Sequence, residues 1–273
     1  MIDLHIHTTN SDGIFTPTEI IEMSIKQNIK TISFCDHNSI KSYENLIIPD
    51  NIEIIKGIEF YANKEGIGGT FHLLGYDYSI NNEIIELMKF FSDKRKESTL
   101  IKLEEIKKKY NIIINIEDLS GTWLCNKNIM EYLNKKYDEQ YSKIIIDFVR
   151  SLKIKTDRKK DYKELIQIIR RANGIPVLAH PKSIVCSDID EFIKDLVNNG
   201  LMGIEVYHSS HDYHDIKKYL ELANKYNLLI SGGSDFHGNY HKNSLGENVI
   251  LGNSNLSGGI EDVSILKYIR SRK

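Results

Sequence analysis

The segment I-D-L-H-I-H at residues 2–7 decides how the rest of the chain is interpreted. It alternates apolar and polar side chains with the period of two that is typical of a β-strand. Because successive side chains of a strand point to opposite faces, Asp3, His5 and His7 share one face. Two imidazoles so placed can bind one divalent ion, although an isolated H-x-H pair is equally compatible with plain strand histidines. The functional interpretation therefore depends on the remaining sequence.

Short β-rich runs alternate with amphipathic stretches on both sides of a long middle segment. Thr16-Pro17-Thr18-Glu19 is a helix start, with Thr16 as N-cap, proline at the first helical position and Glu19 completing a capping box. This alternation favours parallel β/α units over a sandwich. We expect strands at 2–7, 31–35, 52–61, 70–76, 175–180, 201–207 and 228–231, and further helices near 190–198, 213–226 and 260–271.

The strand pattern disappears between Asp77 and Gly174. Residues 82–110 are rich in Lys and Glu and apolar at helical spacing, which predicts one or two helices. Further helices are expected at 129–137, 142–152 and 161–172, whereas 112–116 is ambiguous. We therefore predict an α/β domain formed by residues 1–80 and 170–273, interrupted by an all-helical insertion, or cap, at 81–169.

Composition excludes several classes of protein. The 273 residues are 41% hydrophobic and 27% charged, as in an ordinary globular protein and unlike a disordered chain or a coiled-coil rod. No apolar run approaches the roughly 18 residues that span a membrane, and no signal-peptide pattern is present. Three cysteines are too few and too scattered for a disulfide framework. We expect a cytoplasmic protein with no membrane partner and no obligate protein partner.

Charge is distributed unevenly along the chain. Residues 80–175 hold 21 Lys and Arg against 15 Asp and Glu, whereas the remainder holds 15 against 23. Two sets of solvated helix faces would account for this difference. The alternative is a basic module next to an acidic one that binds cations.

Histidines and carboxylates cluster at the ends of the expected strands. In a parallel β/α barrel those ends converge on one face, where active sites are built. Donors of this mixed kind, without thiolates, suit Mn²⁺, Fe²⁺ or Zn²⁺. Nine ligands are too many for one ion, so we expect two or three divalent ions with a carboxylate such as Glu59 as a bridge. The candidate ligands are His5, His7, Asp12, His37, Glu59, His72, His180, Asp235 and His237.

The ordered motifs resemble the PHP (polymerase and histidinol phosphatase) family. They are D-L-H-x-H-T, S-D-G, D-H-N, G-I-E, F-H-L-L-G-Y, A-H-P and S-D-F-H-G, within residues 1–80 and 170–245. The resemblance is closest to the stand-alone nucleotide phosphoesterase branch with a helical insertion. It implies a distorted (β/α)7 TIM-like barrel. It also implies one ion on His5, His7, Glu59 and Asp235, a second on Glu59, His72 and His180, and a third on Asp12, His37 and His237.

The same resemblance implies a metal-dependent hydrolase of phosphate monoesters. The expected substrates are small nucleotides, such as nucleoside 3',5'-bisphosphates, or short oligonucleotide ends. A phosphatase of a non-nucleotide metabolite such as histidinol phosphate, and an amidohydrolase of C–N bonds, remain alternatives. Asp235 would orient the attacking water, Asp36 would support the metal cluster from outside, and Asp3 would fix a ligand imidazole.

Other polar residues are candidates for contact with substrate. We expect His208 and His211 to bind substrate or transfer a proton, and His241 to reach substrate from its polar loop. Related bisphosphate phosphatases have an Arg-x-His pair in the insertion, where this chain has L-C-N-K-N-I at 124–129. They also tend to have an arginine just after A-H-P, where this chain has Lys182. Lys182 is therefore our candidate for the non-reacting phosphate, as a point charge without the fork of arginine.

Overall fold

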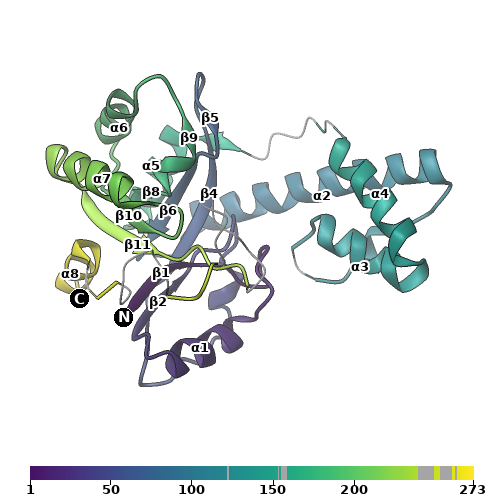
Figure 1. Ribbon diagram of the computed structural model, residues 1–273, viewed down its shortest axis with the longest axis horizontal. Helices are drawn as coiled ribbons and strands as arrows, with labels where there is room; N and C mark the ends of the chain where they lie inside the picture. The colour runs from purple at the N-terminus through teal and green to yellow at the C-terminus, as the bar shows by residue number, and fades with distance from the viewer. Residues whose placement is uncertain (122, 153, 155–158, 239–248, 253–259, 262) are drawn as a thin grey trace. The chain divides into compact units, whose positions relative to one another are not determined.

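The chain divides into two compact units in a computed structural model (Figure 1). The structure describes residues 1–121, 123–152, 154, 159–238, 249–252, 260–261 and 263–273. Residues 1–85 and 159–273 form one unit, called the mixed unit below, and residues 86–158 form the other, called the helical unit. Every described residue that we singled out as a candidate for metal or substrate chemistry lies in the mixed unit.

Two sheets form the framework of the mixed unit. The first has three parallel strands, β1 (Ile2–Ile6), β2 (Thr31–Phe34) and β3 (Glu53–Ile54), in that order. The second has the order β11-β10-β8-β6-β4-β7 (Figure 1). Its strands are β4 (Gly57–Asn63), β6 (His72–Tyr76), β7 (Lys160–Asp161), β8 (Ile175–Leu178), β10 (Gly203–His208) and β11 (Leu229–Gly233). A small antiparallel pair joins β5 (Gly68–Gly69) to β9 (Ile184–Val185).

One strand corrects the expectation of purely parallel units. β6 pairs antiparallel with both of its neighbours, β4 and β8. His72 is the first residue of this strand rather than one near its end. Because β6 runs in reverse, its beginning lies at the same edge of the sheet as the carboxyl ends of the parallel strands. The reversal therefore brings His72 to the edge where the other candidate ligands lie.

Helices of the mixed unit bury one apolar stripe each. The predicted capping box of α1 (Pro17–Lys26) is confirmed, since the Thr16 hydroxyl accepts from Glu19 N and the Glu19 carboxylate accepts from Thr16 N. α5 (Tyr162–Arg171), which we assigned to the insertion, belongs to the mixed unit because its buried stripe contacts β4, β6 and β8. The remaining helices are α6 (Ile189–Asn198), α7 (Tyr213–Lys225) and α8 (Ser264–Ser271), with 3-10 turns at Lys41–Tyr43 and Pro181–Ser183.

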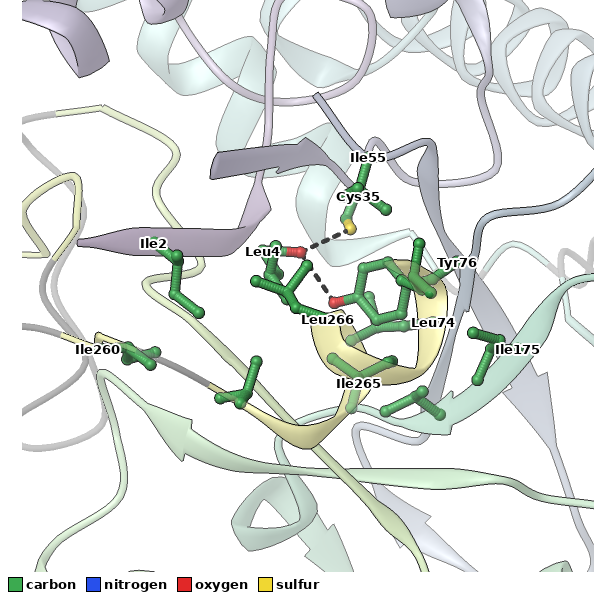
Figure 2. Packing of buried hydrophobic residues seen from close by; sticks show 14 residues of the cluster. Ile2, Leu4, Cys35, Ile55, Leu74, Tyr76, Ile175, Ile260, Ile265 and Leu266 are labelled. Atoms are coloured by element: carbon green, nitrogen blue, oxygen red, sulfur yellow. Dashed lines mark hydrogen bonds between the residues drawn. The ribbon is translucent and has the colours of Figure 1, made fainter. Parts of the chain in front are cut away.

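A hydrophobic cluster anchors β1, the strand that carries the first histidine pair. Figure 2 shows Tyr76 and Cys35 directed at the main chain of Leu4 from two other strands. The Tyr76 hydroxyl donates to the Leu4 carbonyl at 2.8 Å, and the Cys35 thiol donates to it at 3.2 Å. Cys35 is fully buried in this cluster, as expected for a small residue that packs rather than binds a metal. The core thus holds β1 rigidly one residue from His5.

The regular secondary structure of the helical unit, among its described residues, consists of helices. It contains most of α2 (Asn82–Tyr110), together with η2 (Ile116–Asp118), α3 (Asn126–Lys136) and α4 (Glu139–Ser151). No strand occurs among its described residues, and 112–115 has no regular structure. Its core includes Ile106, Ile129, Leu133, Ile145 and Ile146. Among the helices that the structure describes, none has the length and apolarity needed to cross a membrane.

Candidate metal centre

Main-chain hydrogen bonds bring the strand ends together and position the ligands. Just beyond β1, His7 N donates to the Phe236 carbonyl at 2.9 Å, and Asp235 N donates to the His5 carbonyl at 2.8 Å. After β2, Asn38 N donates to the Glu59 carbonyl at 2.8 Å. Each bond ties the main chain at or next to a candidate ligand to a segment that carries another candidate from a distant part of the sequence. These main-chain hydrogen bonds therefore hold several loops together at one edge of the strands, and the site lies there.

Glu59 is the central carboxylate of the site and is fully buried. Its Oε1 lies 2.8 Å from His72 Nδ1 and 2.8 Å from His180 Nε2. Its Oε2 lies 2.9 Å from His37 Nδ1 and 3.3 Å from His7 Nε2. The two oxygens of one side chain thus face imidazoles from four other segments. Both oxygens of Glu59 are therefore within reach of nitrogen atoms that could hold a metal ion.

Two further carboxylates flank Glu59. Asp235 Oδ1 lies 3.1 Å from His7 Nε2 and 3.5 Å from His5 Nε2. Asp12 Oδ1 lies 3.3 Å from His237 Nε2, and Asp12 Oδ2 lies 3.6 Å from His37 Nε2. Donor atoms within 4.8 Å of one another form three groups on these carboxylates: His7, Asp12, His37 and His237; His5, His7, Glu59 and Asp235; and His37, Glu59 and His72.

The nitrogen and oxygen atoms of the site are better suited to bind a divalent cation than to hydrogen-bond with one another. Among the described residues, Glu59 Oε2, His37 Nδ1 and Asp12 Oδ1 are buried without a hydrogen-bond partner, despite lying within ion-pair distance of one another's groups. The Nε2 atoms of His5 and His7 face each other at 3.2 Å. Buried polar atoms normally find partners, so a cluster of nitrogen and oxygen atoms without hydrogen bonds fits a site that holds a cation. Nitrogen and carboxylate donors without thiolates suit Mn²⁺, Fe²⁺ or Zn²⁺.

Electrostatics keep the carboxylates ionised. Burial acts to raise the pKa of Glu59, but His72, His37 and His5 outweigh it and hold that pKa well below its usual range. Burial likewise opposes ionisation of Asp235, yet His5 and His237 hold its pKa well below normal. Burial lowers the pKa of His72 to about 4, which leaves its imidazole neutral. Despite burial, the same carboxylates raise the pKa of His5 and raise that of His7 to about 10, so a cation must displace protons from these two rings.

Backbone conformation at the strand ends is unusual. Asn38, His180 and Asp235 have positive φ angles of 48°, 23° and 58°. Residues other than glycine rarely adopt this region, and such strain concentrates at functional sites where the surroundings enforce it. Here it turns the chain sharply as it leaves β8 and β11, so that His180 and Asp235 point back over the strand ends.

Asp36 supports the loop that carries Asp12. Its carboxylate accepts from Thr8 N at 2.8 Å, from the Ser11 hydroxyl at 2.6 Å and from the hydroxyl of Ser42. The Ser11 hydroxyl in turn lies 3.3 Å from His7 Nδ1. Asp36 thus acts on the candidate ligands only through Ser11 and the loop.

Asp36→Ala should lower the free energy of unfolding by about 3 kcal/mol, because buried donors of Thr8, Ser11 and Ser42 lose their acceptor. Chemical denaturation of the metal-free protein measures this. Asp36→Asn, which keeps one acceptor oxygen, should show a smaller loss. Equal stability of Asp36→Ala and wild type would contradict the assignment.

Asp3 does not contact an imidazole ring, contrary to our expectation. Its carboxylate accepts from Ser234 N at 2.9 Å, the Ser234 hydroxyl at 2.6 Å, Gly252 N at 2.8 Å and His5 N at 3.3 Å. Asp3 lies two residues before His5 on β1, where its carboxylate faces main-chain N–H groups instead of imidazole rings. Asp3 therefore secures the segment that leads to Asp235.

The candidates for substrate contact have different surroundings. His208 lies beside the cluster, with Nε2 3.5 Å from Asp235 Oδ2. His211 is fully buried, its Nδ1 lies 2.8 Å from the Val206 carbonyl, and burial lowers its pKa to about 3. Lys182 Nζ pairs with Asp215 at 2.5 Å and Asp212 at 3.4 Å, which engages its charge at the start of α7. His241 lies outside the described residues.

Glu205 belongs to the site and was missed from the sequence. It is fully buried on β10, and its carboxylate contacts both His5 and His180. The only sequence signal was its place on a strand that ends in a histidine. A single glutamate in an apolar run does not reveal which strands lie across from it.

The mixed α/β fold gathers six imidazoles and three carboxylates at one edge of its strands, which is the donor set of a metal-binding protein. Within that class, the family model of the PHP domain matches residues 3–199. The chain belongs to the PHP domain family.

Two curated relatives and one solved structure are similar to this chain over most of its length. The chain is 26% identical over 251 residues to a phosphoribosyl 1,2-cyclic phosphate 1,2-diphosphodiesterase from Eggerthella lenta, covering 87% of this chain and 94% of the relative. It is 24% identical over 259 residues to a 3',5'-nucleoside bisphosphate phosphatase from Chromobacterium violaceum, covering 86% and 87%. A solved structure of an amidohydrolase from Chromobacterium violaceum with bound sulfate superimposes with a TM-score of 0.70 at 21% identity, covering 99% and 96%.

Proposed function

We propose that the protein is a metal-dependent phosphoesterase that hydrolyses phosphate monoesters of small nucleotides, such as nucleoside 3',5'-bisphosphates, or of short oligonucleotide ends. The observation that carries this proposal is Glu59, whose two buried oxygens face imidazoles from four segments. A bridging carboxylate suits two neighbouring ions, and clustered ions suit displacement at phosphorus. The relatives from Eggerthella lenta and Chromobacterium violaceum support a phosphorylated ribose as substrate.

The same proposal includes a distorted (β/α)7 barrel that is interrupted by the helical unit, residues 86–158, as an all-helical insertion. Isolated bridges join the two sheets at both ends, Ile6 with Phe236 and His37 with Glu59. β1 also contacts β11 and β2 contacts β4, which supports closure of the sheets into one barrel. Closure would place all strand ends around a common axis, as a cluster of two or three ions requires.

Two or three ions would be held by the residues already placed. His5, His7, Glu59 and Asp235 would hold the first, and Glu59, His72 and His180 the second, with His37 also near Glu59. Asp12, His37 and His237 would hold the third, with His7 nearby. When bound, such ions supply an activated water and offset the charge on the phosphoryl oxygens.

Residues of the chain would then orient the substrate and the attacking water. Asp235 Oδ2 lies 3.5 Å from His208 Nε2, so the two side chains flank the same space. Ser210 N donates to His208 Nδ1 at 3.1 Å, which leaves the proton of the neutral ring on Nε2. His208 Nε2–H would thus donate a hydrogen bond to a substrate oxygen, while Asp235 would orient the attacking water.

A panel of substrates tests the proposal directly. The metal-loaded protein is incubated with nucleoside bisphosphates, nucleoside monophosphates, 5'-phosphorylated oligonucleotides, histidinol phosphate and simple amides. Release of inorganic phosphate from the nucleotides is the expected result. Preference for histidinol phosphate would favour the metabolite phosphatase, and ammonia or amine release without phosphate would favour an amidohydrolase. Either result would overturn the proposed substrate class.

Salt should weaken capture of polyanionic substrates. Because residues 80–175 carry an excess of six positive charges, raising salt from about 50 to 200 mM should lower kcat/KM severalfold and change kcat little. Steady-state kinetics on a nucleoside bisphosphate measure this, with p-nitrophenyl phosphate as a less charged control that should respond less. An equal response of both substrates would mean that the basic stretch plays no part in substrate capture.

A further inference from the structure

Glu205 joins two candidate metal ligands that come from different strands. It lies on β10, and its side chain is completely shielded from solvent. Its Oε1 lies 2.9 Å from His5 Nδ1, and its Oε2 accepts from the main-chain N–H of His180 at 2.7 Å. His5 belongs to β1, whereas His180 directly follows β8. The Glu205 carboxylate therefore contacts an imidazole ring on β1 and also the backbone turn that follows β8.

The contact with His5 selects the ring nitrogen that is offered to a cation. His5 Nε2 lies 3.5 Å from both Glu59 Oε2 and Asp235 Oδ1, on the side of the candidate metal centre. His5 Nδ1 points away from that side, toward Glu205. A carboxylate at Nδ1 holds the proton there and leaves the Nε2 lone pair available, because a neutral imidazole carries a single N–H.

The contact with His180 stabilises an unfavourable backbone conformation. His180 has φ 23° and ψ 64°, which a residue with a Cβ atom adopts only when its surroundings enforce it. The bond from His180 N to Glu205 Oε2 is one such constraint. The same turn directs His180 Nε2 to within 2.8 Å of Glu59 Oε1. Release of the N–H would allow the turn to relax and the imidazole to leave Glu59.

We infer that Glu205 is a positioning residue for the metal centre, which sets the tautomer of His5 and the backbone turn of His180 at the same time. The inference rests on the proposed function, because it concerns ligands of the proposed ions. This role requires a side chain as long as glutamate with two oxygens that both accept hydrogen bonds. A glutamine offers only one oxygen, so its NH₂ group must face either His5 Nδ1 or His180 N–H. The first orientation favours the wrong tautomer of His5, and the second sets two donors against each other.

The test compares Glu205→Gln and Glu205→Asp with wild type in metal binding by the metal-free protein. Glu205→Gln should weaken binding of Mn²⁺ or Zn²⁺ by about 10- to 100-fold at the ions that use His5 and His180. Binding at Asp12, His37 and His237 should change by no more than about 3-fold, since Glu205 contacts none of them. Glu205→Asp keeps the charge but is one carbon shorter, so it should also lose affinity. Chelator competition measures each ion.

Nitrogen-15 NMR of the histidine rings distinguishes positioning from a general loss of structure. In the Zn²⁺-loaded wild type, the His5 Nδ1–H should give the downfield proton signal of a hydrogen bond to a carboxylate, and Glu205→Gln should shift that signal upfield or remove it. Asp195→Asn is the matched control, because Asp195, on α6 of the mixed unit, bonds Lys64 and Tyr162 rather than a candidate ligand. It should alter thermal stability without altering metal affinity or the His5 signals.

The outcomes separate the inference from the proposed function. If Glu205→Gln binds all ions as wild type does and keeps the Nδ1 proton of His5, the inference is overturned and the phosphoesterase proposal stands. The inference is also overturned if affinity falls equally for every ion in step with unfolding. Absence of divalent-metal binding by the wild type would overturn both.

Discussion

Replacing His5 with alanine should remove at least one ion and abolish turnover while the fold is retained. His5 Nε2 lies 3.2 Å from His7 Nε2 and 3.5 Å from Asp235 Oδ1, so its loss removes one donor from the group around Glu59. Loss of an ion that stabilises charge on phosphoryl oxygens removes several kcal/mol of transition-state stabilisation, or roughly a 10³-fold drop in kcat or more. Metal analysis after dialysis and single-substrate kinetics measure both effects.

Asp235 should behave in the same way, with one difference in the choice of variant. Asp235 has φ 58°, where alanine is strained and asparagine is tolerated. Asp235→Asn therefore removes the charge without disturbing the turn, and Asp235→Ala serves as its comparison. His214→Ala is the matched control for the histidine variant, because His214 is exposed at the start of α7. Unchanged metal content in His5→Ala and Asp235→Asn would refute the ligand assignment.

Glu59→Gln should have the largest effect, because Glu59 belongs to two of the four donor groups among the described residues. The substitution preserves the shape of the side chain and removes the charge that faces His7, His37, His72 and His180. The protein should lose about two ions rather than one, and kcat should fall by at least as much as in His5→Ala.

Calorimetric titration with Mn²⁺ counts the ions that remain in Glu59→Gln. The control is Glu53→Gln, which removes a carboxylate on β3 that pairs with Arg270 of α8 and should leave the ion count unchanged. Retention of the wild-type stoichiometry by Glu59→Gln would show that no bridging carboxylate is needed at this position.

Patterns within short windows allowed accurate predictions from the sequence. The capping box at Thr16 and Glu19 depends on residues three apart, and its hydrogen bonds are present as predicted. The strand at 2–7 agrees with β1 to within one residue, because apolar alternation reports a strand wherever it packs. The candidate ligands converge because strand ends meet at one edge, a rule that holds without knowledge of which strands are neighbours.

Contacts between distant segments could not be predicted in the same way. The predicted direction of β6 was wrong. The alternation of apolar and polar residues is the same in parallel and antiparallel strands, and only the pairing between strands decides which arrangement forms. Asp3 was expected to touch an imidazole, but main chain near residues 234 and 252 occupies its carboxylate. Lys182 pairs with carboxylates at the start of α7, a helix about 30 residues further along.

The sequence by itself determined the family, the strand and helix pattern around the site, and the residue types that suit a cluster of divalent ions. These features depend on local periodicity and on motif order, which the chain carries before it folds. Only the tertiary structure decided the orientation of each ring, the central place of Glu59 and the contacts of Glu205. Those features depend on atoms from segments as far as 200 residues apart meeting within about 3 Å, as Glu205 and His5 do, and such distances are set by sheet pairing and core packing.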